Sequence, residues 1–129
     1  MKKRILLVDD DCCVRMLLQD FLQDEAYEVD TAIDGLDALE KLNQRCYCYD
    51  LILLDLTMPR MSGLQLLEEL QERAFTLLPL VIALSGDRDA LRQASNMGIG
   101  GALTKPFDLE MLLARLDSLC SVQPSALSA

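Results

Sequence analysis

The sequence predicts an α/β fold in which five β-α units form a three-layer sandwich around a parallel five-stranded sheet. Short apolar runs alternate five times with longer segments of helical period. Three of the runs are apolar throughout, as is typical of parallel strands covered by helices on both faces. The chain has 129 residues, 51% of them hydrophobic, which suits one domain with a single core.

The five strands are predicted at 4–9, 27–32, 50–55, 79–84 and 101–104. The first, third and fourth carry the continuous apolar runs, so we expect them at the centre of the sheet. The second alternates polar and apolar residues, as Tyr27, Val29 and Thr31 show, which predicts an edge strand.

The first and last helices are predicted from apolar stripes at i, i+3, i+4 and i+7 spacing. The stripes are Val14, Leu17, Leu18, Phe21 and Leu22, and Leu109, Leu112, Leu113, Leu116 and Leu119. Three further helices are expected near 35–44, 63–73 and 88–97, with Ser62 and Asp87 as caps and Gly98 as a stop. The domain is expected to span 1–120, with 121–129 as a tail or linker stub.

Composition excludes several classes of function. The formal charge of −9 disfavours direct binding to nucleic acid or to anionic lipid, and no apolar run reaches membrane-spanning length. Histidine is absent, which excludes Ser-His-Asp triads and histidine metal sites. Five irregularly placed cysteines make a poor disulfide framework and indicate a reducing compartment, by default the cytoplasm, with the thiols as small apolar residues.

Polar side chains follow four of the predicted strands, at the edge where ligands of open parallel sheets bind. They are Asp9, Asp10 and Asp11 after the first strand, Asp55 after the third, Ser85 after the fourth and Lys105 after the fifth. Unit charges about 4 Å apart repel by roughly 4 kcal/mol at an effective dielectric of 20. The acidic cluster therefore indicates a cation, and its hard oxygen ligands match Mg²⁺.

Each of these residues also has a plain structural interpretation. Asp11 could cap the following helix, and Asp9 and Asp10 could favour its dipole. Lys105 could be a loop charge, although its place opposite the carboxylates favours an ion pair with Asp55. Ser85 could merely end a strand, or its hydroxyl could hydrogen-bond a phosphoryl oxygen.

Together, an aspartate nucleophile, a divalent cation, a lysine and a hydroxyl meet the needs of phosphoryl transfer to a carboxylate. An ionised aspartate needs no general base to attack phosphorus. The absence of histidine is therefore compatible with this chemistry.

Four stretches carry a resemblance that runs from about Lys3 to Leu119. They are Ile5-Leu6-Leu7-Val8-Asp9-Asp10-Asp11, Asp50 to Pro59 with Met61-Ser62-Gly63, Ala83-Leu84-Ser85-Gly86, and Thr104-Lys105-Pro106-Phe107. In this order and spacing they resemble the receiver domain of two-component response regulators. The resemblance implies a flavodoxin-like fold with strand order 2-1-3-4-5.

The resemblance also implies roles for individual residues. Asp55 looks like the phosphoacceptor, and Mg²⁺ would be held by Asp9, Asp10, Asp55 and the backbone carbonyl of Thr57. Ser85 matches the family's hydroxyl residue, and Lys105, which precedes a proline usually joined through a cis bond, matches the family's lysine. Gly63 matches the turn that opens the third helix.

As such a domain, the chain would take its phosphoryl group from a histidine kinase or a histidine phosphotransfer protein and signal to a downstream effector. The resemblance implies self-catalysed phosphoryl transfer and autodephosphorylation in a signalling domain, not a dedicated enzyme.

The sequence departs from the family pattern at Ala102, where receivers commonly carry an aromatic switch residue, so signalling by a moving ring is not expected. Cys12 and Cys13 begin a predicted helix beside Asp9 to Asp11, and this acidic setting does not favour a redox function. Cys46 and Cys48 lack further ligands nearby in sequence for zinc.

Two other functions fit part of the pattern. A haloacid-dehalogenase-like phosphatase would use Asp9 and Asp11 as its D-x-D motif, but it would leave Asp55 unexplained. A pseudo-receiver would bind a partner without being phosphorylated, which Ala102 allows and the acidic residues, Ser85 and Lys105 oppose.

Overall fold

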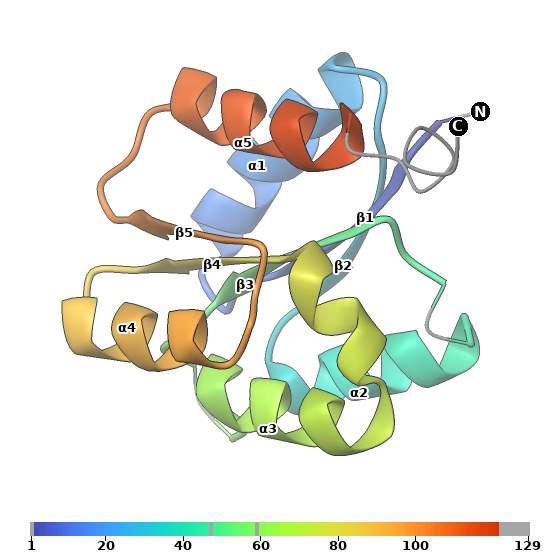
Figure 1. The fold of residues 1–129 in the computed structure, drawn as a ribbon. Coiled ribbons are helices and arrows are strands. Elements are labelled where there is room, and N and C mark those ends of the chain that lie inside the picture. The colour runs from blue at the N-terminus through green and yellow to red at the C-terminus, as the bar shows by residue number, and fades with distance from the viewer. Residues whose placement is uncertain (1, 47, 59, 122–129) are drawn as a thin grey trace.

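The computed structural model describes residues 2–46, 48–58 and 60–121, and Figure 1 shows strands alternating with helices. The elements are β1 Arg4–Val8, α1 Cys12–Asp24, β2 Glu28–Ala32, α2 Gly35–Gln44, β3 Leu51–Asp55, α3 Gly63–Arg73, the 3₁₀ helix η1 Phe75–Leu80, β4 Val81–Ser85, α4 Arg88–Asn96, β5 Gly101–Thr104 and α5 Leu109–Ser121. Position 59 and the predicted tail from residue 122 onward lie outside the described residues.

The strands form one parallel sheet in the order β2-β1-β3-β4-β5, which confirms the predicted fold class and the place of β2 at an edge. Helices α1 and α5 cover one face of the sheet, and α2, α3 and α4 cover the other (Figure 1). The chain is therefore a three-layer sandwich with the carboxyl ends of all five strands at one edge.

Each face of the sheet has its own apolar core. Leu6 and Val8 of β1 pack toward α2, α3 and α4, whereas Ile5 and Leu7 pack toward α1 and α5. All five residues of β3 and of β4 are buried, as expected for central strands covered on both sides. The continuous apolar runs that predicted these strands are thus explained by burial on two faces.

The register of the sheet sets the heights of the strand ends. Val8 pairs with Leu54, Asp55 with Leu84, and Ser85 with Thr104. Asp9 therefore follows β1 at the level of Asp55, whereas Ser85 stands one residue beyond that level. The register therefore brings the predicted site residues to one edge of the sheet, with Asp9 and Asp55 at one level and Ser85 one residue farther out.

Some predicted boundaries differ from the structure. The strand predicted at 79–84 begins at Val81, because residues 75–80 form a 3₁₀ helix that contains Pro79. The apolar stripe of α1 is narrower than predicted, since Leu18 and Leu22 are buried but Leu17 is 59% exposed. Helix α1 therefore packs on the sheet through Leu18 and Leu22, and the side of the helix that carries Leu17 is exposed to solvent.

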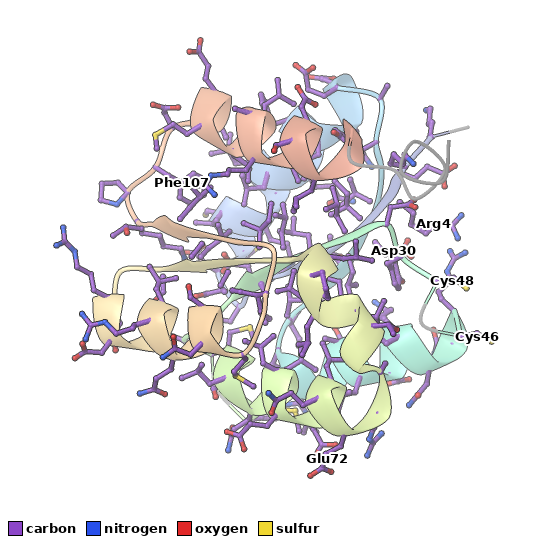
Figure 2. The ribbon with its side chains drawn as sticks, in the orientation of Figure 1. Arg4, Asp30, Cys46, Cys48, Glu72 and Phe107 are labelled. Carbon is purple, nitrogen blue, oxygen red and sulfur yellow. The ribbon has the colours of Figure 1, made fainter. Side chains whose placement is uncertain are left out.

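The cysteines also differ from expectation. Cys12, Cys13, Cys46 and Cys48 are free, as predicted, but all four are exposed and none fills the core. Figure 2 shows Cys46 and Cys48 on the connection between α2 and β3, far from Phe107. None of the helices in the described ranges is long and apolar enough to cross a membrane.

Candidate functional site

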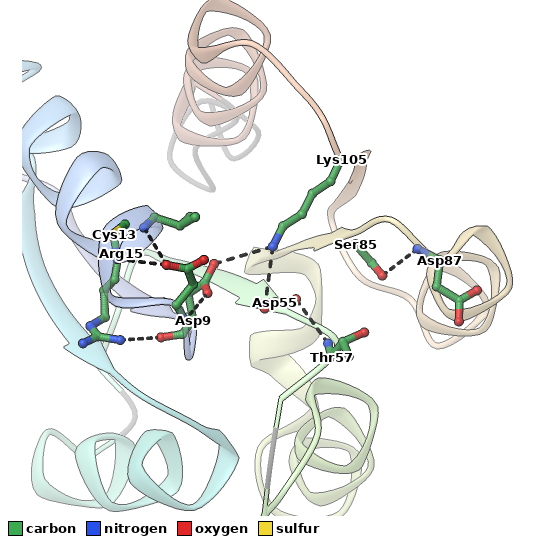
Figure 3. Close-up of polar contacts among 10 residues, drawn as sticks. Asp9, Cys13, Arg15, Asp55, Thr57, Ser85, Asp87 and Lys105 are labelled. Atoms are coloured by element: carbon green, nitrogen blue, oxygen red, sulfur yellow. Dashed lines mark hydrogen bonds and ion pairs between the residues drawn. The ribbon is translucent and has the colours of Figure 1, made fainter.

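Two buried aspartates face one lysine at the carboxyl edge of the sheet (Figure 3). Asp55 is the last residue of β3, and Asp9 directly follows β1; both are at most 5% exposed. The Lys105 Nζ lies 3.6 Å from Asp55 Oδ2 and 3.7 Å from Asp9 Oδ2. The predicted ion pair between Lys105 and Asp55 is present, and it is shared with Asp9.

A third carboxylate completes the cluster. Ligand oxygens of Asp9, Asp10 and Asp55 all lie within 4.8 Å of one another, and Asp10 is exposed while the other two are buried. Asp11 stands outside this group, because its carboxylate caps α1 by accepting hydrogen bonds from the backbone N–H groups of Cys13 and Val14. Of the two interpretations of Asp11, the helix cap is therefore the one the structure supports.

Asp9 accepts hydrogen bonds through Oδ1 and through its backbone carbonyl, whereas within the described residues its Oδ2 has only the ion pair with Lys105. Its Oδ1 accepts from the Asp11 N–H at 2.9 Å, and its backbone carbonyl accepts from Arg15 Nη1 at 2.8 Å. Its buried Oδ2 has no hydrogen-bond partner among the described residues. A buried carboxylate oxygen in this state calls for a cation, so the residues present fit a metal such as Mg²⁺.

Burial dominates the electrostatics of the two inner carboxylates. Desolvation raises the pKa of Asp55 to about 6, against the opposing effects of the Thr57 N–H and of Lys105. Burial also raises the pKa of Asp9, and the nearby carboxylates add to the shift in both residues. The cluster therefore holds more negative charge than Lys105 alone balances.

The loop after β3 orients Asp55. The Thr57 N–H donates to Asp55 Oδ1 at 3.2 Å, which leaves Oδ2 toward Lys105. Gly63, at the start of α3, lies so close to the β3 end that a Cβ there would be 2.6 Å from the Asp55 backbone oxygen. The loop between β3 and α3 thus ends in close contact with the backbone of Asp55.

Ser85 is buried at the end of β4, the strand beside β3. Its hydroxyl oxygen accepts from the Asp87 N–H at 3.0 Å, and Asp87 caps α4, as predicted. Ser85 thus has the predicted place at the site edge.

Two further observations bear on the predicted features. The Lys105–Pro106 peptide bond is cis. Ala102 lies half-buried in β5, paired with Ala83, where the family pattern has a ring.

Sequence reasoning missed Arg15, although its position four residues after Asp11 on the predicted helix was a signal that it turns toward the acidic loop.

Taken together, the edge offers a buried nucleophilic carboxylate, a facing ammonium group and a cluster of hard oxygen ligands. A carboxylate in this setting can attack an electrophilic phosphorus atom while neighbouring cations neutralise the oxygens around it.

Comparison with known proteins gives a consistent result. The model of the response regulator receiver domain matches residues 5–117. The chemotaxis protein CheY of Treponema pallidum is 34% identical over 117 residues, covering 90% of this chain and 81% of that protein. The CpxR homolog of Haemophilus influenzae is 36% identical over 124 residues, covering 95% of this chain. The chain spans 53% of that regulator's length, so it accounts for about half of it.

Among solved structures, the response regulator TrrA of Thermotoga maritima, in complex with Mg²⁺ and BeF, superimposes with a TM-score of 0.79 at 34% identity. The match covers 91% of this chain and 98% of TrrA. The fold is therefore shared with TrrA over 91% of this chain.

Proposed function

This chain belongs to the response regulator receiver domain family, the phosphoacceptor domain of two-component systems, and from that premise we propose that Asp55 accepts the phosphoryl group. The observation that carries the proposal is the burial of Asp55 at the end of β3, 3.6 Å from Lys105 and within the cluster of three aspartates. The comparisons favour neither the phosphatase nor the pseudo-receiver alternative.

In the proposed reaction, an Asp55 carboxylate oxygen attacks phosphorus, the new O–P bond forms, and the bond from phosphorus to the donor's leaving atom breaks. The leaving group departs with the electron pair of that bond. Lys105 neutralises charge on the transferred group, and the Ser85 hydroxyl donates to one of its oxygens. At neutral pH a carboxyl with a pKa of about 6 is mostly ionised, so Asp55 is ready to attack.

Asp9, Asp10, Asp55 and the backbone carbonyl of Thr57 would hold Mg²⁺. The buried Asp9 Oδ2, which accepts no hydrogen bond from the described residues, and the clustered carboxylate oxygens support this assignment, as does the Mg²⁺ of the TrrA complex. When bound, the metal supplies positive charge that neutralises the phosphoryl oxygens. The same residues would catalyse autodephosphorylation, in which a water oxygen attacks phosphorus, the Asp55 O–P bond breaks, and inorganic phosphate leaves the regenerated carboxylate. We therefore propose a self-catalysing signalling domain and not a dedicated enzyme.

The phosphoryl donor would be a histidine kinase or a histidine phosphotransfer protein, and the phosphorylated domain would act on a downstream effector. The charge of −9 supports partners other than nucleic acid and anionic lipid, and the five irregularly placed cysteines support a cytoplasmic location. The matched residues 5–117 support a domain of 1–120, with 121–129 as a tail or linker.

The proposal is tested by incubating the chain with a small phosphodonor, with and without Mg²⁺, and measuring intact mass. One added phosphoryl group is expected in the wild type with Mg²⁺, and none in Asp55→Asn or in excess chelator. Asp20→Asn, an exposed carboxylate on α1, is the matched control and should be labelled like the wild type. Equal labelling of Asp55→Asn would contradict the assignment.

A further inference from the structure

An ion pair outside the site just described joins the buried Asp34 to Arg60, whose side chain is 56% exposed. Asp34, between β2 and α2, has a side chain only 3% exposed, and it accepts a hydrogen bond from Arg60 Nε. In the described part of the chain, Asp34 is the only buried carboxylate that does not belong to the acidic cluster. Arg60 comes from the loop that follows the proposed phosphoacceptor, so the pair joins two loops that are distant in sequence.

The backbone around Arg60 shows that its position is held by contacts. Arg60 has a φ of 62°, a left-handed conformation that costs a non-glycine residue roughly 1 kcal/mol or more. The next residue, Met61, accepts through its carbonyl a hydrogen bond of 3.0 Å from the Gly35 N–H. A Cβ at Gly35 would lie 2.6 Å from Met61 Cγ, so the two segments are in close contact. We call the contacts of Asp34 and Gly35 with Arg60 and Met61 the 34/60 clasp.

The loop that the clasp holds is the one that orients Asp55. It begins with the Leu56 N–H donating to Leu84 of β4 at 3.1 Å, and it ends with the Gly63 N–H donating to the Leu56 carbonyl at 3.0 Å. Between these points the Thr57 N–H donates to Asp55 Oδ1. A shift of the loop would therefore move both Thr57 and the carboxylate that Thr57 orients.

The segment on the other side of the clasp also contacts the acidic loop. The Ala32 carbonyl, two residues before Asp34, accepts from the Asp9 N–H at 3.1 Å. Residues 32–35 thus contact the loop that carries Asp9 and the loop that follows Asp55. These are the two loops that must keep a fixed separation if their carboxylates are to share one cation.

We propose that Asp34 and Arg60 are positioning residues, whose ion pair sets the affinity of the acidic cluster for Mg²⁺ by fixing the loop that carries Thr57. The proposal rests on the proposed function, because it concerns the same metal site. The hydrogen bonds and ion pairs of Asp34 and Arg60 within the described residues reach none of the proposed ligands, so both residues would act through the loop.

Four variants separate the ion pair from other effects. Arg60→Gly removes the side chain, while glycine adopts a φ of 62° without strain. Arg60→Lys keeps a cation at the same position. Asp34→Asn removes the charge but keeps a residue that caps helices well. Arg73→Ala is the control, because it breaks the exposed pair with Glu69 on α3.

The first measurement is the Kd for Mg²⁺ alone, by calorimetry, at a temperature where every variant is folded. Arg60→Gly and Asp34→Asn should raise the Kd about threefold to tenfold, less than the roughly 10- to 100-fold loss typical of residues that contact a metal ligand directly. Arg60→Lys and Arg73→Ala should stay within twofold of wild type. A Kd within twofold of wild type for Arg60→Gly, or an equal rise for Arg73→Ala, would overturn the proposal.

The second measurement is amide hydrogen exchange in the metal-free protein. Residues 57, 58 and 60–62 should exchange faster in Arg60→Gly, while the central strands keep their protection. Unchanged exchange in this loop would overturn the positioning role whether or not the metal binds. A wild-type chain that binds no Mg²⁺ would instead contradict the proposed function, so the two failures are distinguishable.

Discussion

Lys105 and Asp55, which lie far apart in sequence, meet at 3.6 Å because β3 and β5 end at the same edge of the sheet. Lys105 is also 3.7 Å from Asp9, so one ammonium group faces a cluster of three carboxylates. One positive charge cannot balance three negative ones. The excess negative charge is the physical reason to expect strong linkage between stability and a divalent cation.

The first prediction is that Mg²⁺ raises the melting temperature of the wild type. A cation that binds only the folded state stabilises it by about 2.7 kcal/mol at 100 times its Kd. Asp55→Asn should lose most of this gain, because it removes one proposed ligand. In excess chelator the same variant should be more stable than wild type by about 1–2 kcal/mol, since a buried charge is neutralised.

Thermal unfolding monitored by circular dichroism, with Mg²⁺ and with chelator, checks both halves of this prediction. The exposed Asp20→Asn serves as control and should respond to Mg²⁺ like the wild type. An Asp55→Asn variant that is less stable than wild type in chelator would show that burial of this charge is not costly.

The second prediction concerns two glycines. Gly63→Ala should destabilise the fold by about 2–3 kcal/mol, because the new Cβ would lie 2.6 Å from both the Asp55 backbone oxygen and the Leu56 Cα. Gly86→Ala is the matched control, since a Cβ there meets nothing within 4 Å, and its effect should stay within about 0.5 kcal/mol. Urea unfolding of the two variants gives the comparison, and similar midpoints would contradict it.

The third prediction is a pH dependence from Asp34. The hydrogen bond from Arg60 holds the pKa of Asp34 below its ordinary value, and the Asp37 N–H adds to this. Because the folded state favours the ionised form, the stabilisation is present above the ordinary pKa of about 3.9 and is lost as pH falls through the lower folded value. Asp34→Asn should therefore be less stable than wild type at pH 7, with a difference that shrinks below about pH 4.

Urea midpoints at pH 7, 5, 4 and 3 measure this difference. If the difference in urea midpoint between wild type and Asp34→Asn stays constant down to pH 3, the ion pair does not contribute to stability through the charge of Asp34.

The fourth prediction concerns partner docking on α1 beside the site. Met16 and Leu17 are each 59% exposed, and Leu17 borders an apolar cleft with Pro106 and Phe107 (Figure 2 labels Phe107). If a histidine kinase is the donor, as proposed, the segment that carries its phosphohistidine must approach this edge to reach Asp55. Met16→Glu should slow transfer from a histidine kinase about tenfold, through lost apolar contact and added negative charge, and should spare labelling by a small phosphodonor.

Transfer from radiolabelled kinase, followed over time, checks this prediction. Leu36→Glu is the control, because Leu36 is an exposed apolar residue of α2 on the opposite face of the sheet. Equal transfer rates for wild type and Met16→Glu would show that this face is not the docking surface.

The central strands and the candidate site residues could both be predicted from the sequence, because the central strands are continuous apolar runs. Strands buried on both faces must be apolar throughout, so the chemistry-bearing residues that end them stand out, as Asp55 does after Leu51 to Leu54. The 3₁₀ helix before β4 was missed because Leu77, Leu78 and Leu80 extend the apolar run of the strand while Pro79 prevents pairing there.

The clasp could not be predicted from local patterns. An exposed arginine in a loop and an aspartate before a helix are both common on surfaces, and only the tertiary packing of α2 against the loop after β3 buries one against the other. The exposed cysteines show the same limit, because a small apolar residue can be accommodated either in a core or on a helix flank.

The register at the carboxyl edge makes the depth of the site a property of strand length. Because Asp55 is level with Leu84, Ser85 stands one strand residue, a step of about 3.3 Å, beyond the proposed acceptor Asp55. Deleting one residue from β4 would remove this one-residue offset. The side chains that follow the deletion in β4 would then point to the other face of the sheet. The spacing between Asp55 and Ser85 is thus set by the number of residues in β4. A side-chain substitution could not restore it after such a deletion.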